Sequence, residues 1–348
     1  MNNLKYFKGS LLVTVLGAAA AYFLLDGLHA LFLVAVLTVL EVSLSFDNAV
    51  VNATVLRDMD AKWRRRFLTW GILIAVFGMR IVFPVAVVSV VAAVSPWAAI
   101  EIAINDPSQY QILMESAHVS LMGFGGSFLM LVGLDFFLSD DKDDHWIGFI
   151  ELPIQFLGKI KFAAEIITGL VILLIWNTFL SSEADQSSFL YSGVAGIASF
   201  TAIQKLTEYM ESGEESRVSD ATTVAAKSGL GMFLYLEILD ASFSFDGVIG
   251  AFAISTNLFI IAIGLGIGAM FVRSLTIMLV EKNTLEEYRY LEHGAFYAII
   301  ALATIMFLKT FVHVNEIVTG CIGAGFIAVA FVYSLMSKED DVDEASET

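Results

Sequence analysis

Two similar segments place acidic side chains inside apolar stretches of this sequence. Residues 43–51 read SLSFDNAVV and residues 242–250 read SFSFDGVIG, with four of nine positions identical at an offset of 199 residues. Another acid stands two residues before each segment, Glu41 before the first and Asp240 before the second. A charge at the centre of a bilayer costs about 2.5–3.5 kcal/mol, so acids kept in such stretches indicate a functional site.

The residue types in these segments supply oxygen ligands, and neither segment contains His or Cys. Carboxylate and amide oxygens suit Mg²⁺, Ca²⁺ and Mn²⁺ better than Zn²⁺ or Cu²⁺. We therefore predict a site for a divalent cation, with no bound cofactor besides that substrate. The predicted metal ligands are Asp47, Asn48 and Asp246, with Glu41 and Asp240 beside them. The predicted supporting polar or gating residues are Ser43, Ser45, Ser242, Ser244, Glu237, Arg80, Arg273, Asp135 and Glu165.

Two arginines suggest an alternative role for the acids. Arg80 and Arg273 each lie in the apolar stretch that follows one copy of the repeat. The acids could form buried ion pairs with these arginines instead of binding a cation. Both interpretations can hold, because an arginine could neutralise the empty site and compete with the cation.

Helical spacing divides the polar residues of the first copy between two stripes. At about 100° per residue, one stripe holds Glu41, Ser45, Asn48 and Asn52, and the other holds Ser43, Asp47 and Thr54. The second copy repeats the scheme, with Glu237, Asp240 and Ser244 on one stripe and Ser242 and Asp246 on the other. Such a helix is either enclosed on two sides or broken near the motif. Gly247 and Gly250 favour a break in the second copy.

Composition identifies the environment of these residues. The 348 residues are 57% hydrophobic and only 16% charged, and the mean hydropathy is +0.78. A soluble protein carries about 25% charged residues, and an apolar run of roughly 18 residues or more is typical of a transmembrane helix. The run from Ile72 to Val94 has Arg80 as its only charge. The chain is therefore an all-α polytopic membrane protein, and soluble enzyme folds are excluded.

The charged residues are distributed in a way that limits the possible partners. The net charge is −17, and six carboxylates fall within residues 338–348, which predicts a solvated, disordered tail. Basic residues are few and dispersed, so we expect no nucleic acid partner.

Cys321 is the single cysteine and excludes an intramolecular disulfide. The sequence has no GxxxxGK[ST] motif, so transport would depend on a gradient or a partner.

We predict ten membrane spans, at residues 9–25, 28–56, 67–95, 117–138, 162–180, 189–205, 229–255, 257–280, 294–312 and 314–336. With the N-terminus in the cytoplasm, sixteen of the nineteen Lys and Arg fall in inside segments and none in outside loops. The positive-inside rule thus favours ten spans with both termini cytoplasmic. A cleaved signal peptide in place of the first span is the alternative, because Lys5 and Lys8 precede an apolar stretch.

The two copies of the repeat are separated by five spans and so run in opposite directions. Inverted repeats are typical of secondary transporters, whose substrate site lies near the bilayer midplane between the halves. We expect a first membrane half at 1–181 with spans 1–5, a second at 182–336 with spans 6–10, and an acidic disordered cytoplasmic tail at 337–348. The predicted activity is export of a divalent cation by alternating access.

The SFDN and SFDG motifs, with Glu41 and Asp240 upstream and arginines in the next spans, resemble the TerC family of integral membrane proteins. This family belongs to the wider LysE-type transporter superfamily, and the resemblance covers roughly Leu28 to Met336. It implies tellurium resistance or manganese export, a location in the bacterial plasma (inner) membrane, and Asp47, Asn48 and Asp246 as motif positions. Gly247 replaces the asparagine of the first copy, so the implied site is asymmetric.

Other functions remain open at the level of sequence. The chain could export an amino acid or another small organic solute, or serve as a membrane scaffold for a metal or tellurite stress-response complex. An intramembrane aspartyl protease also needs two aspartates, but the chain lacks the GxGD and PAL sequences of that class, so we expect no enzyme. The further partners that we consider are the lipid bilayer, a proton or sodium counter-ion, and a second copy of the chain or a stress-complex protein.

Overall fold

The computed structural model describes residues 4–139, 145–212, 221–252 and 254–347, and this part of the chain is helical without a strand. The elements in chain order are α1 (Leu4–Leu24), α2 (Gly27–Leu44), α3 (Phe46–Asp58), α4 (Ala61–Leu73), the π-helix η1 (Ile74–Val82), α5 (Phe83–Val91), α6 (Pro96–Asn105), α7 (Pro107–Ser116), α8 (His118–Leu138), α9 (Gly148–Gly158), α10 (Ala163–Thr178), α11 (Glu183–Ser212), α12 (Ala221–Phe252), α13 (Leu258–Glu281), α14 (Thr284–Glu287), α15 (Leu291–Lys309) and α16 (Glu316–Glu347).

Six helices of the described part are long and apolar enough to cross a membrane. They are α1, α2, α8, α13, α15 and residues 318–337 of α16, and the bent α4–η1–α5 segment makes a seventh candidate. The prediction of a helical polytopic membrane protein is thus confirmed at this coarser level. All ten predicted ranges contain helix. However, α10 has only 16 residues, and α11 and α12 are less apolar or more charged than the candidate spans.

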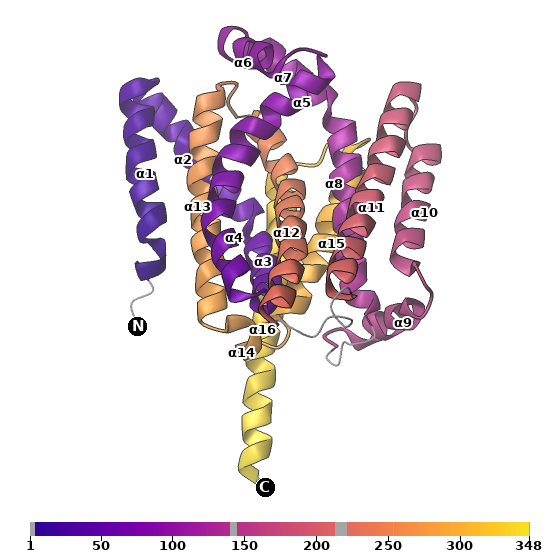
Figure 1. The fold of residues 1–348 in the computed structure, drawn as a ribbon. Coiled ribbons are helices and arrows are strands. Elements are labelled where there is room, and N and C mark those ends of the chain that lie inside the picture. Colours follow the sequence, from indigo (N-terminus) through magenta and orange to yellow (C-terminus); the bar gives the residue numbers. More distant parts are fainter. Residues whose placement is uncertain (1–3, 140–144, 213–220, 253, 348) are drawn as a thin grey trace.

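The helices form one bundle with a helical cap at one end (Figure 1). The cap is α6 and α7, which occupy residues 96–116, the segment predicted as an outside loop. The start of α1 and the end of α16 both lie at the other end of the bundle. α2 and α3 run away from the cap, whereas α12 runs toward it. The segments that carry the two copies of the motif are therefore antiparallel.

The two copies differ in backbone geometry. The first is broken at Ser45 (φ −108°, ψ 16°), which ends α2 and precedes α3. The second copy lies within α12, which is continuous, so the break that Gly247 and Gly250 led us to expect there is absent. These glycines instead allow close packing, since a Cβ at Gly247 would lie 3.2 Å from Glu41 Oε2 and one at Gly250 would lie 2.8 Å from Glu316 Cγ.

The helix that carries Arg80 also departs from regular α geometry. The π-helix η1 ends one residue before Phe83, whose backbone N–H bonds back five residues to the carbonyl of Gly78. Pro84 follows and cannot donate a backbone hydrogen bond, and its ring crowds the carbonyl four residues earlier. The wider π turns relieve this crowding. A separate bend of 43° lies earlier in the segment, between the helical stretches Ala61–Gly71 and Val76–Val91.

The other end of the chain is helical. The helix α16 extends to Glu347 and so enters residues 337–348, for which a disordered acidic tail stays a prediction. The sequence contains neither Gly nor Pro after Gly325, so nothing in the backbone chemistry ends this helix early.

Close packing of α13 against α2 positions the first acid. Gly264 and Gly268 are separated by three residues and face α2, so the two backbones approach closely. A Cβ at Gly264 would lie 2.5 Å from Leu37 Cβ, and one at Gly268 would lie 2.5 Å from both Cβ and Cγ of Glu41. The side chain of Glu41 is therefore held against a surface that only glycine can provide.

Replacing Gly268 with alanine should destabilise the bundle by about 1–3 kcal/mol, because the new methyl group overlaps Glu41 close to its backbone. Gly266→Ala on the same helix is the matched control, since its nearest neighbour is Val76 Cγ1 at 3.3 Å, the mobile end of a side chain. Thermal unfolding in detergent, followed by tryptophan fluorescence, should show a lower midpoint for Gly268→Ala alone. Equal midpoints for the two variants would contradict this packing.

Candidate functional site

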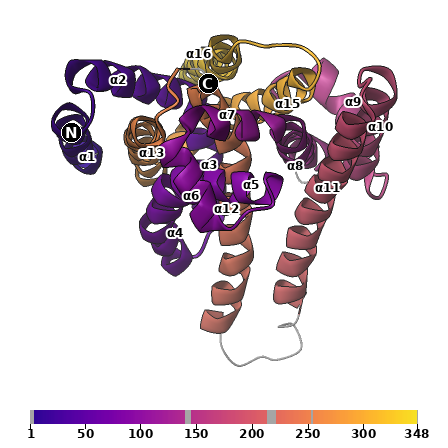
Figure 2. The ribbon, with the colours of Figure 1, turned by 90° about the horizontal axis from the view of Figure 1, so that it is seen from above.

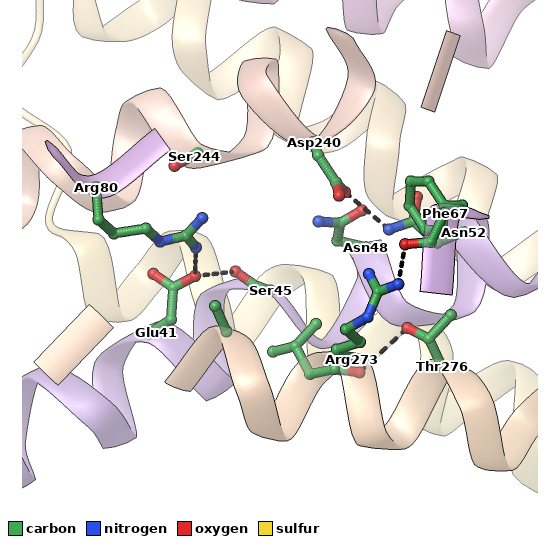
Figure 3. Close-up of a pocket in the computed structure, with 12 residues that line it drawn as sticks. Glu41, Ser45, Asn48, Asn52, Phe67, Arg80, Asp240, Ser244, Arg273 and Thr276 are labelled. Atoms are coloured by element: carbon green, nitrogen blue, oxygen red, sulfur yellow. Dashed lines mark hydrogen bonds and ion pairs between the residues drawn. The ribbon is translucent and has the colours of Figure 1, made fainter. Parts of the chain in front are cut away.

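A small cavity inside the bundle gathers half of the predicted site residues (Figure 3). Its volume is about 30 Å³, which is enough to hold water or a small ion. Four helical segments contribute to it: α2–α3, the α4–η1 segment, α12 and α13. The lining residues are Glu41, Ser45, Asn48, Asn52, Phe67, Arg80, Asp240, Ser244, Ala269, Val272, Arg273 and Thr276.

One side of the cavity holds an ion pair between α2 and η1. Arg80 Nη2 donates to Glu41 Oε1, and Ser45 Oγ donates to the same oxygen at 3.2 Å. Glu41 is 2% exposed and Arg80 is 5% exposed, so both charges are removed from solvent. The π-helical turns of η1 bring the arginine to this position, which satisfies both charges within the membrane-spanning part of the chain.

The other side of the cavity centres on Asp240 of α12. Asn52 Nδ2 donates to Asp240 Oδ1 at 2.7 Å, and Asn48 lies beside the same carboxylate (Figure 3). Arg273 Nη2 donates to the backbone carbonyl of Phe67, and its guanidinium lies 5.0 Å from the centre of the Phe67 ring. Both arginines interact electrostatically with Asp240. The second acid is thus compensated by two amides and two cations.

Three buried oxygen atoms that line this cavity have no hydrogen-bond partner among the described residues. They are Asn48 Oδ1, Asn52 Oδ1 and Ser244 Oγ. The Asn52 amide must present its nitrogen to Asp240, because an ionised carboxylate only accepts, so the amide oxygen is turned elsewhere. Buried polar atoms in proteins are almost always paired with protein, water or an ion. These oxygens therefore indicate a place for a small polar ligand.

Two predicted residues next to the cavity have other surroundings. Glu237 of α12 lies against Gly71, where a Cβ would be 3.1 Å from Glu237 Oε1, and it interacts electrostatically with Arg273. Its Oε1 is buried without a hydrogen-bond partner in the described part of the chain. Ser242 lies on the opposite side of α12, is fully buried and donates to the carbonyl of Ile238 at 2.9 Å.

Asp47, predicted as a principal ligand, does not line the cavity. Its carboxylate accepts from the backbone N–H of Asn48 at 2.9 Å, and its Oδ2 faces α16, 3.0 Å from where a Cβ of Gly323 would lie. Asp47 is 4% exposed and occupies the first turn of α3, where the helix dipole favours an anion. Asp47 and Asn48 are therefore neighbours in sequence, but the Asn48 side chain lines the cavity and the Asp47 side chain faces α16. Asp246 lies on α12, but its side chain is outside the described part of the structure.

The remaining predicted residues are distant from the cavity lining. Ser43 is exposed and donates to the carbonyl of Val39 at 2.8 Å. Asp135, near the end of α8, accepts from Gln204 Nε2 at 3.0 Å and interacts with Glu165 of α10. These two acids lie near the end of the bundle opposite the cap, on α8 and α10.

The predicted stripes account for much of this arrangement. All four members of the first stripe line the cavity, and the members of the second stripe face elsewhere. Four lining residues were missed: Phe67, Ala269, Val272 and Thr276. Phe67 contributes a backbone carbonyl, Thr276 uses its hydroxyl within its own helix, and the other two contribute packing, none of which residue type reveals. No group of three or more His, Cys, Asp or Glu side chains within the described residues is arranged to hold a metal ion.

The charges that line the cavity balance. Glu41 and Asp240 contribute two negative charges, and Arg80 and Arg273 contribute two positive charges. From the sequence we considered that the acids could form buried ion pairs with the arginines. Glu41 and Arg80 form such a pair in this conformation. A divalent cation could enter only if at least one arginine moved away.

Fold and site together define a helical, multi-pass membrane protein with a charge-compensated polar cavity inside its bundle. The chain belongs to the family described as "Protein of unknown function (DUF475)", whose profile matches residues 46–341. No curated protein and no solved structure matches the chain. The match begins at Phe46 and so includes Asp47 and Asn48 of the first motif and all of the second.

Removing one partner of the Glu41–Arg80 pair should destabilise the protein by about 3–5 kcal/mol, because a buried charge is left uncompensated. Arg80→Met and Glu41→Gln should each lower the unfolding midpoint strongly, and the double variant should recover part of the loss. The partly exposed Arg57, which pairs with Asp58 and Glu292, is the control, and Arg57→Met should change stability by about 1 kcal/mol or less. Additive losses in the double variant would show that the two side chains do not depend on each other.

Proposed function

We propose that this protein is a secondary transporter that exports a divalent metal cation, with Mn²⁺ as the first substrate to test. The observation that carries the proposal is the set of unpartnered oxygens of Asn48, Asn52 and Ser244 around a cavity that also holds two acids. Amide, hydroxyl and carboxylate oxygens are the ligands that Mg²⁺, Ca²⁺ and Mn²⁺ prefer. The choice of manganese rests on the resemblance of the repeated motif to the TerC family.

The size of the cavity favours an ion over an organic solute. A volume of about 30 Å³ accommodates water or a small ion, whereas sites for organic molecules typically measure about 300–1,000 Å³. Arg80 and Arg273 could pair with the carboxylate of an amino acid, but both already contact protein oxygens. A role as a scaffold for a stress-response complex would not account for the three unpartnered oxygens at the cavity.

In the proposed cycle, the positions of Arg80 and Arg273 determine whether the site can bind a cation. Two unit charges about 4 Å apart interact by about 4 kcal/mol at an effective dielectric constant of 20. A divalent ion beside Asp240 would repel both arginines, so cation binding and the inward position of the arginines exclude each other. In this cycle the inward position of the arginines belongs to the cation-free form, and return of the arginines to the acids would drive release.

We further propose ten crossings in two inverted halves, residues 1–181 and 182–336. The opposite directions of α2–α3 and α12 support this arrangement (Figure 1), as do the paired acids and arginines. The distribution of Lys and Arg supports cytoplasmic termini, and the resemblance to the TerC family implies a bacterial plasma membrane. Alternating access would move one half against the other, with a proton or sodium ion as the candidate counter-ion.

Mn²⁺ flux into proteoliposomes tests the transport function and the site. Glu41→Gln and Asp240→Asn should abolish flux, because each removes a carboxylate from the cavity. Glu281→Gln should leave flux unchanged, since Glu281 lies on α13 but is exposed and pairs with Lys5. A pH gradient that changes the native flux would identify a proton as the counter-ion.

The outcomes of this assay separate the parts of the proposal. No Mn²⁺ flux from folded native protein would remove manganese as the substrate. Flux that persists in both cavity variants would remove this site. Asp47→Asn and Asp246→Asn, measured alongside, show whether the motif aspartates are also required.

Cysteine accessibility in intact cells tests the number of crossings. In a Cys321→Ser background, Ser182→Cys lies between α10 and α11, and Lys282→Cys follows α13. Ten crossings predict that an impermeant maleimide labels Ser182→Cys in intact cells and Lys282→Cys only after lysis. If α10 and α11 do not cross, Ser182→Cys also requires lysis.

A further inference from the structure

A second, much larger hollow lies between α2 and α16, on the other side of the repeat motif from the polar cavity. Its volume is about 940 Å³, at the upper end of the roughly 300–1,000 Å³ typical of small-molecule sites. α2 and α16 lie along the same edge of the bundle (Figure 2), so this groove is bounded by two candidate membrane spans at the bundle periphery.

The lining of the groove is apolar along its length. Val39 and Leu40 of α2 form one wall, and the small residues Gly320, Ala324 and Ala328 of α16 form the other. Val39 and Ala328 are exposed, so the groove opens away from the bundle. A water-filled route for an ion would need polar walls, which makes this groove unsuitable as part of the cation pathway.

One end of the groove is polar and lies at the junction of α15 and α16. His313 and Asn315 line it, together with Glu316, whose Oε2 lies 2.6 Å from Lys309 Nζ. Lys309 is buried, whereas the Glu316 side chain is 23% exposed and His313 is exposed. An apolar channel that ends in a polar, charge-balanced cluster at the end of two spans matches an amphipathic molecule with a headgroup of no net charge.

We propose that this groove binds a zwitterionic phospholipid of the phosphoethanolamine class. Its acyl chain lies between α2 and α16, its ammonium group contacts Glu316, and its phosphate lies near His313. Because a bilayer is as apolar as the groove, the acyl chain adds little selectivity. The headgroup contacts therefore distinguish this lipid from its neighbours in the membrane.

A helix of a second copy is the competing occupant, since small residues on a span also permit helix packing. The polar end argues for the lipid. Glu316 and His313 are accessible where a headgroup would lie, and the apolar face of a partner helix would bury them without new polar contacts.

The lipid would contact the turn that carries the motif. Leu44 and Phe46 line the groove, whereas Ser45, between them, lines the polar cavity. A single turn of backbone thus separates the two hollows. Occupancy of the groove would hold the α2–α3 break in place from the membrane side.

Cys321 lines the groove and is exposed, and it is the only cysteine of the chain, so the native protein carries its own probe. The experiment measures alkylation of Cys321 by N-ethylmaleimide in delipidated, detergent-solubilised protein during addition of palmitoyl-oleoyl-phosphatidylethanolamine. Labelling is expected to fall, in a saturable way, to a small fraction of its lipid-free rate. The corresponding phosphatidylglycerol should protect only at higher concentration.

Two variants of α16 provide the matched comparison. Ala328→Phe fills the groove and should remove the lipid dependence of labelling. Phosphatidylethanolamine should co-purify with the native chain in native mass spectrometry and be lost from this variant. Val332→Phe lies one turn further along α16, is exposed and does not line the groove, so it should behave as the native chain does. Size-exclusion chromatography checks that both variants fold.

Three results would overturn the proposal. Labelling could be independent of phosphatidylethanolamine, or both lipids could protect equally. Protection could instead rise with protein concentration, with cross-linking of two chains through Cys321, which would identify a second copy as the occupant. None of these results depends on whether the protein transports manganese.

Discussion

The structure depends on the cost of placing charge in a medium that cannot solvate it. Glu41, Asp240, Arg80 and Arg273 are all located within the apolar bundle, where an isolated ion is strongly disfavoured. Each is compensated by a group from a different helix: Arg80 for Glu41, Asn52 for Asp240, and the Phe67 carbonyl for Arg273. These contacts join α2, α3, α4, η1, α12 and α13. The polar centre therefore fixes how these helices lie against one another.

Local irregularities of the helices serve this compensation. The break at Ser45 turns the serine toward Glu41, and the π-helical turns before Pro84 set the position of Arg80. Gly268 lets α2 approach α13 so closely that Glu41 has little room to move. Regular helices would place the same side chains at other heights along the bundle. The departures from ideal geometry occur where the charges have to meet.

Residue type and spacing revealed the class of protein and most of the cavity. Glu41, Ser45, Asn48 and Asn52 share a helical stripe, and this periodicity survives the break because one irregular residue shifts the phase only slightly. Identity between the two copies suggested equivalent roles for Asp47 and Asp246, but Asp47 faces Gly323 of α16. The direction of a side chain beyond a helix break depends on tertiary packing, which a repeat in the sequence does not encode. The π-helix and the helical cap were likewise invisible, because neighbouring helices decide them.

The first copy of the motif is broken and the second is continuous, and this difference bears on which copy would move in the proposed transport cycle. The first copy is split into two helices, and a helix end can rotate at small cost, whereas α12 is continuous and resists bending. Cavity and groove meet at the split copy, where Leu44, Ser45 and Phe46 face alternate sides. A movement of this turn would change both hollows together. The arginines can leave the acids only if some helix moves, and the non-helical dihedral angles of Ser45 make the α2–α3 junction one place where such a movement can occur. In the proposed cycle we therefore expect the broken copy to move and the continuous copy to support it.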